Sequence, residues 1–186
     1  MAKATKAAAK KTAKKAPTKT AQPNGTPEGA TPEGTAPVGD GQPSLNILGQ
    51  YLKDLSFENP NAPQSLAAQD GQPEINISVN VNAKNLAPTD FEVELHIEAQ
   101  AVHQGNAVFA AELLYAGIFR LENIPEDALH PIILVECPRM IFPFARQILA
   151  DATQKGGFPP LMLDPIDFAS MYEKRVSEGD ESPVSN

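Results

Sequence analysis

The sequence predicts an α+β domain in which a four-stranded antiparallel sheet has helices packed on one face. Two observations carry this prediction. Four segments between residues 51 and 121 have the alternation or the apolar content of strands. From residue 124 to residue 175 the apolar residues recur at helical spacing instead. Because all the strands precede the helices, we expect an antiparallel sheet rather than alternating β-α units.

The first strand is expected at residues 51–58, "YLKDLSFE", just before a proline-rich loop. Leu55 and Phe57 alternate with Asp54 and Glu58, so the two carboxylates lie on one face and the two apolar side chains on the other. At ~3.3 Å per residue, Asp54 and Glu58 are separated by roughly 13 Å. That separation is too large for the pair to share a proton or a metal ion.

Two middle strands, 74–82 and 91–102, alternate without a fault, which indicates one buried and one exposed face. The exposed positions of the second include three glutamates, which we expect to form a solvated acidic face: Glu92, Glu94 and Glu98. "HQGN" at 103–106 reads as a hairpin turn. The fourth strand, 107–121, is apolar at nearly every position, which favours a central strand with a bend or bulge near Gly117.

The helical part begins near Pro125, with Glu126 and Asp127 in the first turn, where the helix dipole favours them. Pro131 makes this helix short or kinked. A second helix is expected over 138–155 and is ended by two glycines. A third is expected over 164–175, "DPIDFASMYEKR", with Asp164 as its N-cap.

Composition divides the chain into three parts. Residues 1–44 contain a Lys-rich arm and a Pro/Gly linker with too few large apolar residues to fold, so we expect them to be disordered. Residues 45–175 form a predicted folded domain of about 130 residues, long enough to bury a core. Residues 176–186 form a predicted disordered acidic tail.

Charge and residue types exclude several classes of function. The predicted domain holds eight basic and 17 acidic residues, so it should repel nucleic acid and attract basic partners. Cys137 is the only cysteine, which excludes an intramolecular disulfide, and we expect it in the core. The three histidines, His96, His103 and His130, show no ligand spacing, so we expect no metal and no cofactor.

Neither catalysis nor membrane insertion is indicated. The sequence contains no nucleophile elbow and no phosphate-binding glycine motif, so we expect no enzyme. It lacks an apolar run near 18 residues and a signal-peptide core. Cytoplasm is therefore the expected location.

Five blocks in order give the chain a family resemblance: "KDLSFENPNAP", "QPEINISVNVNAKNL", "GIFRLENIP", "CPRMIFPFAR" and "GGFPPLMLDPIDFASMY". From about residue 50 to residue 175 the sequence resembles the SecB family of protein-export chaperones. The resemblance implies a homotetramer, a dimer of dimers, with helices at its centre and sheets facing outward. It implies a chaperone that holds unfolded precursor proteins and delivers them to the SecA ATPase of the Sec pathway.

The resemblance also implies two sites. The contact with the basic, zinc-bearing C-terminal tail of SecA maps onto Asp54, Glu58, Ala110 and Glu112, where Ala110 replaces the leucine often found in the family. Two carboxylates spaced along one strand face suit a surface that binds a basic peptide. The loop 59–73 resembles the family's wall of the client groove, and the candidate groove residues are Phe57, Phe119, Phe142, Phe144, Phe158, Leu161, Met162, Phe168 and Met171.

Two alternatives stay open. A SecB-like chaperone dedicated to one client, such as an antitoxin, would use the same fold. A nucleic-acid-associated protein could use the Lys-rich arm, which carries seven lysines and no acidic residue between residues 3 and 19. We favour the export chaperone with broad clients.

Overall fold

The computed structural model describes residues 41–67 and 71–179, and the chain divides into two units, Met1–Ala36 and Pro37–Asn186. All described residues belong to the second unit. Its elements in order are β1 (Ser44–Glu58), a short 3-10 turn η1 (Gln64–Leu66), β2 (Glu74–Ala87), β3 (Asp90–His103), β4 (Asn106–Glu122), α1 (Glu126–Pro131), a π-helical segment η2 (Ile132–Glu136), α2 (Cys137–Lys155) and α3 (Phe168–Ser177).

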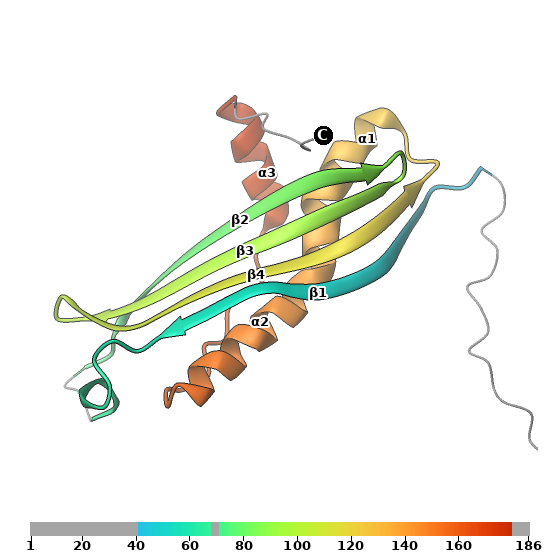
Figure 1. Cartoon of the computed structure of the whole chain (residues 1–186). Coiled ribbons are helices and arrows are strands. Elements are labelled where there is room, and N and C mark those ends of the chain that lie inside the picture. Colours follow the sequence, from blue (N-terminus) through green and yellow to red (C-terminus); the bar gives the residue numbers. More distant parts are fainter. Residues whose placement is uncertain (1–40, 68–70, 180–186) are drawn as a thin grey trace, which may run out of the picture. The chain divides into compact units, whose positions relative to one another are not determined.

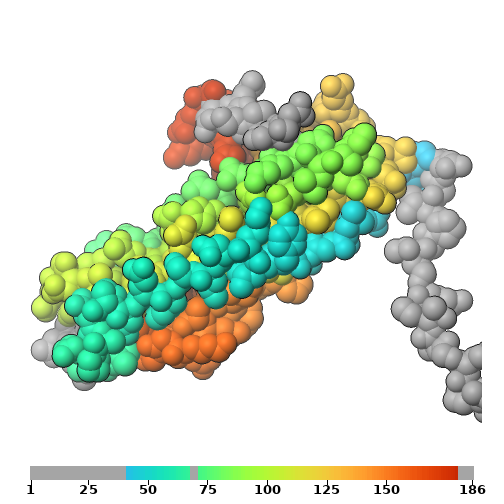
Figure 2. Space-filling view, in the orientation of Figure 1, coloured from blue at the N-terminus to red at the C-terminus, as the bar shows by residue number. Residues whose placement is uncertain are grey.

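The four strands form one antiparallel sheet in the order β1-β4-β3-β2, and the helices lie on one of its faces (Figure 1). This confirms the predicted α+β class and the predicted central place of the fourth strand. β1 and β2 are the two edges of this sheet, and β1 is visible along its whole length in Figure 2. We call the helix-covered face the inner face and the opposite face the outer face.

The hairpin between β3 and β4 forms where the sequence predicts it. His103 pairs with Asn106, so the turn has only two central residues. Both have positive φ, 50° at Gln104 and 78° at Gly105. Positive φ at both central residues gives the turn a twist that matches the twist of the two strands, as is common in two-residue hairpins.

β1 is longer than predicted and contains two irregularities. It runs for 15 residues, and its pairing with β4 shifts between Ile47 and Gly49 and again between Leu52 and Asp54. Each shift places one extra residue in β1 and exchanges the faces on which the following residues lie. The alternation of the whole segment is therefore broken twice, which is why only its last part could be recognised from the sequence.

The bulge expected near Gly117 lies in the partner strand: the β1 pairing shifts opposite Ile118 and Phe119, where Leu48 is the extra residue. Gly117 pairs regularly with Gln50 and with Val93. A Cβ at this position would lie 2.7 Å from the ring of Phe119 and 3.1 Å from Ile141. Glycine is required here because the ring of Phe119 on the same strand, together with Ile141 of α2, occupies the space that a Cβ would take.

Helical structure is continuous from Glu126 to Lys155, because the π-helical segment joins α1 to α2. Pro131, the last residue of α1, is followed directly by this segment. By length and composition alone, the joined helix could cross a membrane. Its apolar side packs on the sheet, as in the core helix of a folded domain, so these two properties do not indicate a membrane span.

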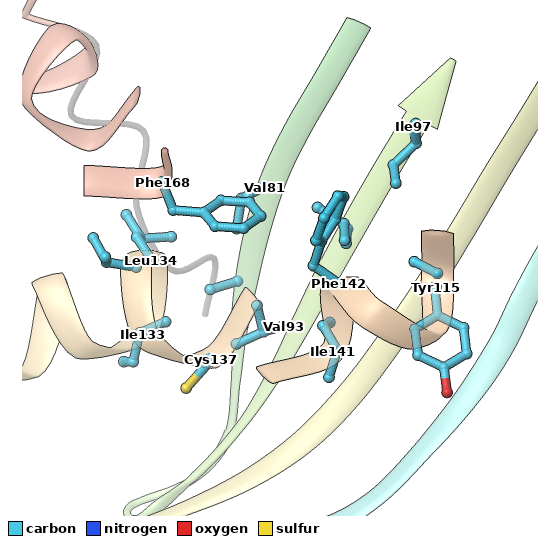
Figure 3. Close-up of a cluster of buried hydrophobic side chains, with 14 of the residues drawn as sticks. Val81, Val93, Ile97, Tyr115, Ile133, Leu134, Cys137, Ile141, Phe142 and Phe168 are labelled. Carbon is cyan, nitrogen blue, oxygen red and sulfur yellow. The ribbon is translucent and has the colours of Figure 1, made fainter. Parts of the chain in front are cut away.

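The core lies between the inner face of the sheet and the helices. Figure 3 shows Ile141 and Phe142 of α2 and Phe168 of α3 among Val81 and Val93 of the sheet. Cys137 is fully buried in this cluster, as predicted, and burial raises the pKa of its thiol to about 12. A thiol with such a pKa stays protonated and unreactive at neutral pH.

α3 begins three residues later than predicted. Asp167, not Asp164, caps it, and its side chain accepts a hydrogen bond of 3.0 Å from the backbone N–H of Ser170. This bond holds the pKa of Asp167 below its ordinary value. The stretch 159–167 has no regular secondary structure, so Asp164 and Pro165 lie before the helix.

The regular structure covers Ser44 to Ser177. The predicted arm and linker, except residues 41–44, and residues 180–186 of the predicted acidic tail lie outside the described residues.

Candidate functional site

The register of the sheet gathers the predicted acidic residues on the outer face. Glu58 pairs with Ala110, and Ser56 pairs with Glu112. Asp54, Glu58 and Glu112 are all exposed. The strand alternation, the bulge before Asp54 and the β1–β4 register together place these three carboxylates on one surface.

Two further residues, both from β3, belong to this surface. Glu98 pairs with Glu112 across the sheet, so it lies on the same face. The Nε2 atom of His96 lies 2.8 Å from a carboxylate oxygen of Glu112 and 3.7 Å from one of Glu98. We call Asp54, Glu58, His96, Glu98 and Glu112 the open acidic cluster.

A shallow hollow of about 260 Å³ lies within this cluster. Glu58 borders it from β1, Glu98 from β3 and Glu112 from β4, and Ala110 contributes a small side chain. The short side chain of Ala110 leaves room that a leucine would fill. The surface at this point is therefore less apolar than the family pattern implies.

The prediction of a solvated face at Glu92 and Glu94 is wrong. Only 7% of Glu92 and 6% of Glu94 is exposed. Lys53 lies 3.0 Å from Glu92 and 2.5 Å from Glu94, and Lys84 lies 2.7 Å from Glu94. The hydroxyl of Tyr51 also donates to Glu92. These five residues are the closed cluster.

The pairing in the closed cluster changes its pKa values. Burial alone would raise the pKa of Glu94, but hydrogen bonds from Lys53 and Lys84 outweigh it and hold that pKa below its ordinary value. Hydrogen bonds to Glu94 and Glu92 raise the pKa of Lys53. Burial, followed by the hydrogen bond to Glu92, raises the pKa of Tyr51. Glu94 is therefore negatively charged and Lys53 positively charged at neutral pH, and with two lysines against two glutamates the closed cluster presents little net charge to a partner.

A second candidate surface is aromatic and lies at the C-terminal end of β1. The rings of Phe57 and Phe109 stack with centroids 5.7 Å apart, and Phe158 lies 5.1 Å from Phe109 and 6.4 Å from Phe57. Phe57 and Phe158 are partly buried. The structure thus brings together two of the predicted groove residues and packs them on Phe109, which is only 4% exposed and supports the two accessible rings from beneath.

The loop after α2 is built to hold Phe158 in this position. The backbone N–H of Phe158 donates to the Thr153 carbonyl, and the buried Thr153 hydroxyl accepts from the backbone N–H of Leu161. A Cβ on Gly156 would lie 2.3 Å from the Phe57 ring. Gly156 is therefore needed for the helix end to approach β1 so closely.

Sequence reasoning missed Phe109 because β4 is apolar at nearly every position, so its alternation does not mark one face. Only the pairing of Phe57 with Ala111, two residues from Phe109, shows that it lies beside Phe57. Similarly, the spacing of His96 from Glu112 gave no signal, because the two residues meet only through the β3–β4 register.

Three of the predicted groove residues are not accessible in the described chain. Phe119, Phe142 and Phe168 are at most 5% exposed and belong to the main core. A side chain must be reachable to contact a client, so they contribute by packing. Phe144 on α2 and Met162 in the following loop are more than half exposed, Leu161 and Met171 are partly buried, and none of these four belongs to the aromatic cluster.

One group of three among the described residues has side-chain atoms that could coordinate a metal ion within 4.8 Å of one another. It consists of His96, Glu98 and Glu112. The two carboxylates are 56% and 53% exposed, and the imidazole is already bonded to Glu112. Their geometry is that of a surface ion-pair cluster.

Comparison with solved structures identifies the fold. The chain matches a SecB-like chaperone of Mycobacterium tuberculosis, solved in complex with a peptide of the HigA1 antitoxin, with a TM-score of 0.54 at 18% identity. The match covers 66% of this chain and 90% of that one. At this identity the likeness shows a shared fold.

Sequence comparison is more specific. The family described as "Preprotein translocase subunit SecB" matches residues 39–179. The protein-export protein SecB of Azorhizobium caulinodans is 63% identical over 134 residues, which cover 72% of this chain and 84% of that protein. SecB of Xanthobacter autotrophicus is 58% identical over 136 residues, covering 73% and 87%. The chain belongs to the SecB family of cytoplasmic, non-enzymatic protein-export chaperones, which confirms the predicted class.

Proposed function

We propose that this chaperone holds unfolded secretory precursors in a translocation-competent state and delivers them to SecA through its outer sheet face. The observation that carries the proposal is the open acidic cluster. In a member of the SecB family, Asp54, Glu58 and Glu112 converge on one exposed surface at the positions that the family resemblance assigns to SecA docking.

The client is bound elsewhere, through apolar contacts. Phe57 and Phe158 offer a partly buried aromatic surface beside the loop that begins after β1, and Met162 adds exposed apolar area. Aromatic rings and a methionine can pack against many different side chains. An unfolded chain would therefore bind through several weak contacts with low sequence selectivity, and no nucleotide is needed.

SecA is bound by charge. The closed cluster is neutralised by Lys53 and Lys84, so the field of the outer face is strongest over the open acidic cluster. Exposed ion pairs are each worth roughly 0–1 kcal/mol. Several of them on a preformed face can set the rate and orientation of docking for the basic tail of SecA.

We further propose that the chain assembles as a homotetramer, a dimer of dimers. The edge strand β1 exposes Leu48, Leu52 and Leu55, and α2 exposes Met140 and Phe144. Two separate apolar surfaces, one on a sheet edge and one on a helix, supply the two interfaces that such an assembly needs.

Light scattering tests the assembly. We expect a mass of about four times the 19.9 kDa chain. A monomer whose mass does not change with concentration would contradict the proposed architecture.

The docking test is the double variant Asp54→Asn with Glu58→Gln, measured by calorimetry with the basic SecA tail. Both side chains are exposed and take part in no ion pair among those found in the described residues. We expect binding to weaken by about fivefold to thirtyfold, and added salt to weaken wild-type binding similarly. Capture of an unfolded precursor should be nearly unchanged.

Asp151→Asn with Glu173→Gln is the matched control. It removes the same two charges from exposed positions on α2 and α3, on the other side of the sheet. SecA-tail affinity should stay close to wild type. An unchanged affinity in the Asp54/Glu58 variant, or an equal loss in the control, would show that Asp54 and Glu58 are not the docking site.

The single-client alternative is supported by fold likeness alone, at 18% identity, whereas the export proteins are 58–63% identical over most of the chain. Pull-down from lysate distinguishes the two functions. Many unprocessed envelope precursors support the export chaperone, and one dominant partner supports the alternative.

A further inference from the structure

His96 occupies a central place in the open acidic cluster. Its Nε2 atom lies 2.8 Å from Glu112 and 3.7 Å from Glu98, and its side chain is 26% exposed. The imidazole thus contacts one carboxylate on its own strand and one on β4. No other histidine among the described residues lies in an ion pair with a carboxylate of the outer face.

The other groups around His96 are not free to compensate a change in its charge. On β2 it pairs with the neutral Asn80, and on β4 with Leu114. Along β3 the preceding outward residue is Glu94, whose charge is already matched by Lys53 and Lys84. The charged groups around the imidazole on this face are therefore Glu98 and Glu112, which contact it, and Asp54 of β1, which pairs with Leu114 on the other side of β4.

We propose that His96 is the charge regulator of the docking face: its protonation neutralises part of the Glu98–Glu112 pair and weakens the binding of a basic partner. This inference rests on the proposed function, because it concerns the same surface. It adds two residues, His96 and Glu98, to the docking site, neither of which the family resemblance assigns.

The geometry gives the direction of the effect. A neutral imidazole donates its Nε2 hydrogen to Glu112 and leaves both carboxylates with their full charge. A protonated imidazole carries a positive charge against Glu112 and within 4 Å of Glu98, so an incoming lysine or arginine meets a smaller net negative charge and a nearby positive one. Histidine is the side chain that ordinarily changes charge between about pH 5 and 8, whereas carboxylates do so near pH 4.

The consequence is a partner affinity that falls with mild acidification. A drop in cytoplasmic pH would lower SecA docking and leave client binding intact, because the aromatic cluster of Phe57, Phe109 and Phe158 carries no titratable group. The chaperone would then keep its precursor instead of releasing it.

The experiment measures binding of pentalysine to the full-length protein at low salt, near pH 8 and near pH 5.5, by calorimetry. The pentalysine is used with an acetylated N-terminus, because a free α-amino group would titrate in this range, whereas the lysine side chains stay charged throughout it. For wild type we expect affinity to fall by about threefold to tenfold on acidification. For His96→Gln, which still offers an N–H to Glu112 but cannot take up a proton, we expect a change of less than about 1.5-fold.

His103→Gln is the matched control, because His103 lies on the same strand but in the β3–β4 hairpin. It should keep the wild-type pH dependence. The inference is overturned if His96→Gln loses affinity on acidification as wild type does, or if wild type shows no change.

The outcomes also separate this inference from the docking proposal. If pentalysine binds at pH 8 and Asp54→Asn with Glu58→Gln weakens it, the docking face stands whatever His96 does. If pentalysine does not bind wild type at pH 8, both the basic-partner surface and its regulation by His96 are wrong.

Discussion

The outer face of the sheet has two halves with similar sequence and opposite behaviour. On β3, Glu92, Glu94 and Glu98 stand at alternating positions and point the same way. Glu92 and Glu94 are almost fully buried in the closed cluster, whereas the Glu98 side chain is 56% exposed in the open one. The same residue type on the same strand is structural at one end and available to a partner at the other.

The difference comes from the neighbouring strands. Lys53 is the extra residue that the second β1 bulge inserts between Leu52 and Asp54, and its side chain covers Glu92 and Glu94. Lys84 covers the same two glutamates from β2. Next to Glu98 the neighbours are Glu112 and Ser78, neither of them basic. Cationic cover therefore decides which carboxylates a partner can reach.

The largest expected effect is that of Lys53→Met, which opens the closed half. It leaves Glu92 without its closest cation and Glu94 with Lys84 alone. Because a buried carboxylate that loses its partner is costly, we expect the free energy of unfolding to fall by about 2–3 kcal/mol. Chemical denaturation at a fixed protein concentration measures it.

The effect of Lys53→Met on stability is compared with that of a variant in the open acidic cluster. Asp54→Asn with Glu58→Gln removes two exposed carboxylates, so the free energy of unfolding should change by less than about 0.5 kcal/mol. Equal losses in the two halves would mean that the closed cluster does not stabilise the fold as its burial implies.

Glu94→Gln gives a smaller effect, with a characteristic pH dependence. The pKa of Glu94 is lower in the folded protein than its ordinary value. Its stabilising contribution is therefore present above the ordinary pKa of a glutamate, near 4.3, and is lost as the pH falls through the folded pKa. Near pH 7 we expect the variant to be about 1–2 kcal/mol less stable than wild type.

Below about pH 4 the stability difference between wild type and Glu94→Gln should shrink towards zero. Parallel denaturation curves from neutral to acidic pH show this directly. If the stability difference stays constant over the whole pH range, the charge of Glu94 does not stabilise the fold. The lower stability of the variant would then come from how the glutamine side chain packs.

The sequence alone determined the local features of this protein. Alternation at Ile75, Ile77 and Val79 correctly predicted a strand at β2, because a period of two is strand geometry, but it predicted burial wrongly, since Ile75 and Ile77 are 42% and 47% exposed. The glycine after His103 and Gln104 fixed the tight hairpin, because it accepts a positive φ without a steric penalty. The family blocks then gave the fold, the chaperone class and the acidic positions on β1.

Tertiary structure alone decided which residues meet. Lys53 covers two glutamates about 40 residues away, and His96 contacts Glu112 from another strand. These contacts depend on strand order, on register and on two bulges, and one extra residue in β1 exchanges its faces. No local pattern records such a shift, because its free energy comes from side chains on other strands. The sequence therefore supplied the charges of the outer face, and only the sheet determined which of them are neutralised and which remain open to a partner.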